Sequence, residues 1–154
     1  MSRVGIFVDA HNLFISLGVR FGGRKLDYAK YLAYVSLLGS VETANVYGIQ
    51  QHKRAIGFIH ALEKSGWICH DRTTAECVSW NVGLCMDVVR FVEQRPDVNV
   101  IVLGSSDGSL VPLLAYLAEK GVRTVILAAG VITDFATCAN SCIEIPESLL
   151  EDRQ

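Results

Sequence analysis

Two short, strongly apolar runs each lead into a turn that carries an aspartate, and this pattern limits the possible folds more than any other feature of the chain. The first run covers residues 4–8 and is followed at once by Asp9. The second covers residues 98–103 and leads into a Gly-Ser-Ser turn that ends at Asp107. Continuous β-branched runs that end in turn residues are typical of buried parallel strands. Because ligands bind outside the carboxyl ends of parallel strands, we expect Asp9 and Asp107 to face one crevice.

The rest of the chain alternates strand-like and helix-like segments, with no internal repeat, low-complexity tract or linker. We expect strands at residues 4–8, 43–49, 67–70, 98–103, 124–128 and 142–145. We expect helices at residues 13–17, 28–38, 55–65, 82–92 and 110–119, with short ones near 135–139 and after 146. Residues 18–25, which include three glycines, and residues 71–80 are expected to be loops. Such alternation predicts an α/β fold with a mostly parallel central sheet and helices on both faces.

Length and composition fit one globular domain. The chain has 154 residues, of which 51% are hydrophobic and 19% charged, so it can bury a sizeable core. We expect the core to span about residues 4–145, followed by a short acidic tail. No apolar stretch reaches the ~18 residues of a membrane span, and the N-terminus lacks the layout of a signal peptide. The five cysteines have no metal-site spacing, which favours reduced thiols and a cytoplasmic location.

Asp87 lies in the apolar, helix-like segment between the two runs, and a helix could bring it to the same crevice. Three converging carboxylates repel one another, and a hard divalent cation is the usual remedy. Repulsion also predicts that at least one of these carboxyl groups has a raised pKa without metal. Simpler roles stay open for two of them. Asp107 could cap the following helix, and Asp9 could be an ordinary turn residue.

Several other chemistries are not supported by the sequence. The chain has no G-x-x-x-x-G-K-[ST] motif, so a P-loop is not expected, and no G-x-G-x-x-G follows the first strand. It also lacks the G-x-S-x-G elbow of acyl hydrolases. A phosphoaspartate mechanism needs a second acid two residues after Asp9, where this chain has His11.

The net charge of -2 does not point to nucleic acid, but the cations are concentrated in the first half of the chain. Mobile cations at a loop could follow a phosphate backbone, and aromatic rings could stack on single-stranded bases. An ordinary mixed surface and ordinary packing are the alternatives. The candidate cations are Arg20, Arg24, Lys25, Lys53 and Arg54, and the candidate rings are Phe21, Tyr47 and Trp80.

Three segments resemble the NYN domain in its bacterial LabA-like form. They are G-I-F-V-D-A-H-N-L, N-V-G-L-C-M-D-V-V and I-V-L-G-S-S-D-G-S-L-V-P-L-L, in the family's order and spacing. The resemblance covers the chain from about residue 4 to 145. It implies a single NYN domain over residues 1–154, with a PIN-like three-layer α/β sandwich, and a metal-dependent ribonuclease activity. By position, Asp9, Asp87 and Asp107 match family acids, and Asn12 matches the nearby asparagine.

The chain also departs from the family pattern at three positions. Asn81 stands where the family often has the aspartate of V-D-V, and Ser109 replaces the second acid of S-G-D-x-D-F. A late aspartate near the last strand corresponds to Asn140. These changes remove up to three negative charges. Asn81 and Ser109 can still offer oxygen ligands, but weaker ones than a carboxylate.

The resemblance implies an endoribonuclease that uses Mg²⁺ or Mn²⁺ to hydrolyse RNA phosphodiester bonds, with single-stranded RNA as the expected substrate. Asp9 and Asp107 would be metal ligands, and Asp87 a ligand or the group that orients the water. Asn12 and Ser106 would position the phosphate or a water. The alternative is a catalytically weakened or inactive domain that binds RNA or a protein partner. We expect no membrane partner, and the apolar fraction is compatible with a homodimer.

Overall fold

The computed structural model describes residues 1–49, 55–70, 80–130, 135 and 137–153. They form one six-stranded sheet in the order β3-β2-β1-β4-β5-β6. Every neighbouring pair is parallel, which confirms the prediction of a mostly parallel sheet. The strands are β1 (Arg3–Asp9), β2 (Ser40–Tyr47), β3 (Ile68–Cys69), β4 (Val100–Gly104), β5 (Arg123–Ala128) and β6 (Ser141–Glu144).

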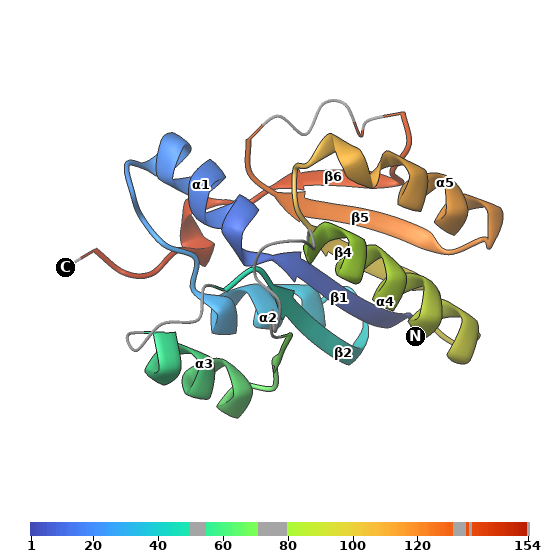
Figure 1. Cartoon of the computed structure of the whole chain (residues 1–154), viewed down its shortest axis with the longest axis horizontal. Helices are drawn as coiled ribbons and strands as arrows, with labels where there is room; N and C mark the ends of the chain where they lie inside the picture. Colours follow the sequence, from blue (N-terminus) through green and yellow to red (C-terminus); the bar gives the residue numbers. More distant parts are fainter. Residues whose placement is uncertain (50–54, 71–79, 131–134, 136, 154) are drawn as a thin grey trace.

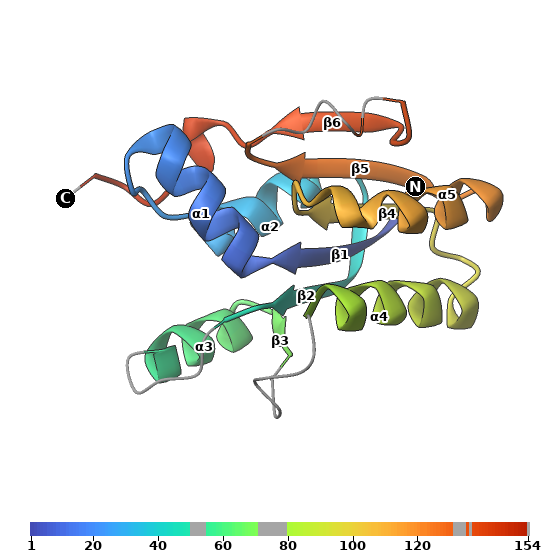
Figure 2. The same cartoon turned by 45° about the horizontal axis from the view of Figure 1, so that its top comes forward.

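Helices cover both faces of this sheet, as the alternating pattern predicts. In Figures 1 and 2, α4 and α5 lie over one face and α2 over the other, while α1 extends beyond the end of β1. The helices are α1 (Ala10–Phe21), α2 (Tyr28–Ser36), α3 (Ala55–Lys64), α4 (Trp80–Gln94) and α5 (Val111–Glu119). Two short 3-10 helices, η1 (Gly108–Leu110) and η3 (Glu147–Leu149), follow β4 and β6.

The alternating side chains of the central strand β1 fix these layers. Phe7 points to α4, where its ring meets Phe91 edge-on at 5.9 Å. On the opposite face, the buried Tyr31 of α2 donates its hydroxyl to the Leu127 carbonyl at 2.9 Å. Gly104 must lack a side chain, because a Cβ there would lie 2.9 Å from the Tyr31 hydroxyl oxygen. The packing on each face therefore holds α2 and α4 against the strands whose ends form the site.

Several boundaries differ from the prediction, and two of them matter for the site. The helix α1 does not end at Gly18 but continues to Phe21, because Gly22, at φ 65, is the residue that adopts the left-handed terminating conformation. Trp80 is the first residue of α4 rather than part of a loop, and residues 71–79 lie outside the described residues. The expected short helix at 135–139 is only partly described. In the described parts of the chain, no helix has the length and apolar character needed to cross a membrane.

Candidate active site

Asp9 is the last residue of β1 and caps the N-terminus of α1. Its Oδ1 accepts the backbone N–H of Asn12 at 3.0 Å, and the Trp80 indole donates a further hydrogen bond. The side chain is almost completely buried, at 2% exposure. Burial raises the pKa of Asp9, and the hydrogen bonds from Asn12 and Trp80 only partly oppose it. Asp9 therefore caps a helix rather than serving as an ordinary turn residue, and its burial disfavours the charged carboxylate.

Asp107 follows β4 and caps η1. Its Oδ1 accepts the backbone N–H of Ser109 at 2.9 Å, and its Oδ2 accepts the Nδ2 of Asn81 at 2.6 Å. These bonds, led by the Ser109 N–H, lower the pKa of Asp107. The carboxylate is charged at neutral pH and is held by Asn81 and Ser109.

Asn12 and Ser106 join the ends of β1 and β4. The Asn12 Oδ1 accepts the backbone N–H of Ser106 at 3.0 Å and its hydroxyl at 3.2 Å. The structure therefore brings these two predicted site residues together. Their contact locks the two aspartate-bearing turns beside each other at one edge of the sheet.

Asp87 lies further along α4, above β2. The Tyr47 hydroxyl donates to its Oδ2 at 2.8 Å, and the His70 Nδ1 lies 3.8 Å from the same oxygen. The rings of Tyr47 and His70 stack at 4.4 Å. Burial, followed by Asp87, raises the pKa of Tyr47, whereas burial lowers the pKa of His70 despite the nearby carboxylate. Since Tyr47 pairs with Asp9 in the sheet, Asp87 sits one strand away from Asp9.

The first turn of α4 connects the two strand-end aspartates, because Trp80 binds Asp9 and Asn81 binds Asp107. Asp87 lies seven residues after Trp80, on the same side of the helix about two turns away. Among the residues that the structure describes, no three His, Cys, Asp or Glu side chains are grouped to hold a metal ion. The expected raised pKa is found at Asp9, but its cause is burial and not a neighbouring carboxylate.

The predicted cations are less mobile than expected. Arg20 is part of α1 and pairs with Glu144 at 2.9 Å. Arg24 is mostly buried and is held by the Glu147 carboxylate and the Glu151 carbonyl. Arg24 therefore lies in the loop and Arg20 beside it, but ion pairs hold both side chains. Lys25 is exposed, and no ion pair with the described residues holds it. Lys53 and Arg54 lie outside the described residues.

The three aromatic residues proposed to stack on bases have different surroundings in the structure. Tyr47 is buried in the contact with Asp87, so packing explains it. Trp80 is used inside the site, where its ring also meets the edge of His11 at 5.2 Å. The Phe21 ring lies beside the Arg20 guanidinium, 5.3 Å from its carbon.

Asn140 is a correction to the proposed family correspondence. Its Oδ1 accepts the backbone N–H of Thr124 at 2.8 Å, near the start of β5. This turn is at the amino edge of the parallel sheet, opposite the aspartates. Asn140 therefore does not take a charge away from the site.

Sequence reasoning missed the roles of Gly48, His70 and the bonds made by α4. Gly48 has φ 80, and a Cβ there would lie 3.2 Å from both the Asp9 carboxylate and the Trp80 ring. Its only sequence signal is a glycine directly after a strand. A Trp-Asn pair at the start of a helix-like segment is the corresponding signal for α4.

Comparisons with known proteins agree with this description. The family model for the NYN domain matches residues 3–146. No curated protein matches the chain. A crystal structure of a protein of unknown function from Vibrio parahaemolyticus is similar, with a TM-score of 0.83 and 19% identity over 97% of this chain and 96% of that one. At that identity the likeness supports the fold alone. The family match over nearly the whole length, on an all-parallel α/β sheet consistent with a PIN-like fold, shows that the chain belongs to the NYN domain family.

Proposed function

We propose that this NYN domain is a metal-dependent endoribonuclease that hydrolyses phosphodiester bonds of single-stranded RNA. The observation that carries the proposal is the pair of aspartates at the carboxyl ends of the adjacent strands β1 and β4. The contact between Asn12 and Ser106 holds their two turns together. Ligands bind at this edge in open parallel sheets.

In this proposal the two strand-end aspartates hold one Mg²⁺ or Mn²⁺ ion. Asp9 is a buried carboxylate whose pKa burial raises, and no Lys or Arg of the described chain neutralises it. Mg²⁺ commonly binds through one or two carboxylates, with water and substrate phosphates as its other ligands. A carboxylate has about four lone-pair sites, so the donors that hold Asp9 and Asp107 leave room for a cation. When bound, the cation would polarise a phosphate oxygen and activate a water for in-line attack.

The remaining residues have supporting roles in this proposal. Asn12 and Ser106 position the phosphate or a water beside the aspartates. Asp87, which accepts the Tyr47 hydroxyl, would orient the attacking water rather than bind the metal directly. Asn81 and Ser109 are weak additional ligands. Among the cations, we expect Lys25, together with Lys53 and Arg54, to contact the RNA. Arg20 and Arg24 contribute less, because their charges are paired.

A second candidate is an NYN domain that binds RNA or a protein partner without cleaving it. The Asn81 amide favours this alternative, because it gives Asp107 a hydrogen-bond donor where a family acid would add a second negative charge. A site with fewer carboxylates binds a divalent cation more weakly.

Incubation of the purified protein with end-labelled single-stranded RNA separates the two functions. The nuclease should cleave in Mn²⁺ or Mg²⁺ and not in chelator, and Asp9→Asn and Asp107→Asn should each abolish the cleavage. Glu119→Gln is the matched control, since Glu119 is an exposed acid at the far end of α5. Binding without cleavage at every metal concentration supports the second candidate. Equal cleavage by wild type and both aspartate variants indicates a contaminating nuclease.

A further inference from the structure

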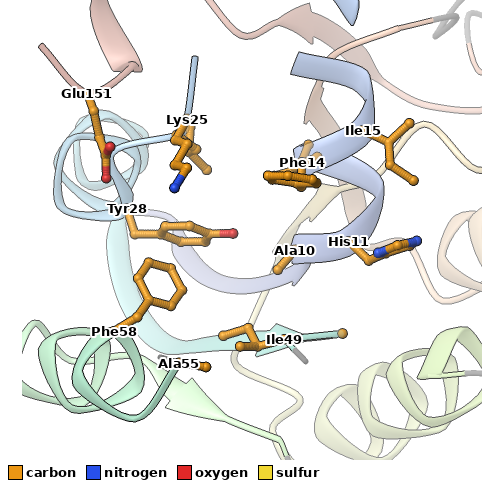
Figure 3. Close-up of a pocket in the computed structure, with 13 residues that line it drawn as sticks. Ala10, His11, Phe14, Ile15, Lys25, Tyr28, Ile49, Ala55, Phe58 and Glu151 are labelled. Carbon is orange, nitrogen blue, oxygen red and sulfur yellow. The ribbon is translucent and has the colours of Figure 1, made fainter. Parts of the chain in front are cut away.

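A pocket of about 510 Å³ opens beside the Asp9 site and is not used by the proposed chemistry. It lies between α1, the start of α2, the end of β2 and the start of α3 (Figure 3). Its volume is in the ~300–1,000 Å³ range of small-molecule sites. Its walls are mainly apolar and aromatic, with Phe14, Tyr28, Ile49 and Phe58 among them.

The pocket and the Asp9 site share a wall. Gly48 lines the pocket, and its Cα also faces Asp9 and Trp80 so closely that a Cβ would lie 3.2 Å from each. Ala10 and His11, the two residues after Asp9, line the pocket as well. A strand of RNA with a phosphate near Asp9 would therefore have its neighbouring nucleoside at the pocket.

Three aromatic side chains, Phe14, Tyr28 and Phe58, line the pocket. Tyr28 and Phe58 meet edge to face at 5.7 Å on one side. In Figure 3, Tyr28 extends from α2 toward Phe14 and Ala10 on α1. Phe14 is 64% exposed, so its ring is accessible to a ligand that enters the pocket. Aromatic platforms of this kind bind single-stranded bases by stacking.

Two charged groups line the same pocket. Lys25 can donate to a base carbonyl or ring nitrogen, and the Glu151 carboxylate can accept a base N–H. The two residues are neighbours, because the backbone N–H of Glu151 bonds to the Lys25 carbonyl at 2.8 Å. Every nucleobase edge that pairs in a duplex presents both donors and acceptors. A lipid chain or an aliphatic side chain has no polar group that could bind Lys25 or Glu151.

The geometry points to this pocket as a subsite for one nucleobase of single-stranded RNA, next to the bond that is cut at Asp9. The base would stack between Phe14 and the Tyr28–Phe58 pair, with its polar edge toward Lys25 and Glu151. Its ribose and phosphate would leave past Gly48 and His11 toward the aspartates. This assignment rests on the proposed function for the identity of its ligand.

The test measures binding rather than cleavage. The probes are a fluorescently labelled five-nucleotide single-stranded RNA and the same strand with abasic riboses, both in chelator. The RNA should bind more tightly than the abasic strand. Phe14→Ala should weaken RNA binding by about 5- to 150-fold, the loss expected for one stacked base, and should leave abasic binding unchanged.

The matched control is Val19→Ala, on the same helix. Val19 is 84% exposed and does not line the pocket, so this variant should bind like wild type. Because both side chains are exposed, neither change should alter melting. Phe58→Ala, on the other wall, provides a second variant with the same expected direction.

Equal binding of the two strands, or RNA affinity in Phe14→Ala within twofold of wild type, would overturn the assignment. Self-association that Phe14→Ala abolishes, without an effect on RNA binding, would also overturn it and make a second copy of the chain the occupant. Cleavage measured in parallel with Mn²⁺ separates this proposal from the nuclease itself. Base-dependent binding without cleavage would refute only the proposed nuclease activity. Cleavage without base-dependent binding would refute only the assignment of the pocket.

Discussion

Asn81→Asp would place beside Asp107 the acid that the family resemblance implies for this position, and its consequences can be worked from the observed contact. The Asn81 Nδ2 and the Asp107 Oδ2 are 2.6 Å apart, so the variant would exchange a hydrogen bond for two facing carboxylates. Two charges about 4 Å apart repel by ~4 kcal/mol at an effective dielectric constant of 20. Both residues are half-buried, and solvent should reduce this to about 2 kcal/mol. For a chain of this size, the metal-free melting temperature should fall by ~4–8 °C.

The same variant should respond more strongly to metal, because a divalent cation relieves the repulsion. If the free Mn²⁺ concentration is about 100 times its dissociation constant, folding gains ~2.7 kcal/mol. Thermal melts in chelator and in millimolar Mn²⁺ measure both effects, with Asn81→Ala as the control that loses the hydrogen bond without adding charge. The reasoning is refuted if Asn81→Asp and Asn81→Ala melt together in chelator and show the same metal increment.

Three further outcomes are expected. The Asp9 carboxyl should titrate above the usual aspartate pKa of ~3.9, so its charge costs stability near neutral pH and protonation relieves that cost as the pH falls. Carbon-detected NMR titration measures this pKa, and Mg²⁺ should lower the titration midpoint. Tyr47→Phe removes the hydroxyl that binds Asp87 and should cost ~1 kcal/mol in denaturant unfolding, whereas Tyr116→Phe, which breaks an exposed bond to Glu93, should cost less. Gly48→Ala should lower the melting temperature more than Gly23→Ala, because both have positive φ but only Gly48 is crowded by Asp9 and Trp80; equal losses would show that the crowding is unimportant.

The fold was predictable because its signals are local and repeated. Each buried strand is an apolar run that ends in turn residues, and each helix has its own periodic face, so alternation alone gives the parallel sheet. The errors fell at boundaries. Gly18 has the residue type of a helix end but not the conformation, which Gly22 adopts one turn later. Trp80 lies outside the apolar pattern that predicts the helix, yet it is the first residue of α4 and bonds to Asp9.

The site was predictable only in part. The sequence shows which residues end the parallel strands, but it does not show which side chains from distant segments contact one another. Asp9 and Asp107 could be placed at one edge from the strand pattern. Asp87 lies in α4, and the Tyr47 that holds it lies at the end of β2, 40 residues earlier in the chain. No local sequence pattern predicts that contact. Asn140 shows the converse, since its position near the last strand resembles a family acid while the strand direction places it at the opposite edge.

The most direct test of the central claim is to locate the metal. Crystals soaked in Mn²⁺ should show an anomalous-scattering peak at the carboxyl edge of the sheet, within ligand distance of carboxylate oxygens of both Asp9 and Asp107. The peak should disappear in Asp107→Asn crystals soaked in the same way. A wild-type crystal with no peak at that edge in millimolar Mn²⁺, or with a peak that touches neither aspartate, would contradict a metal-dependent nuclease centred on these two residues.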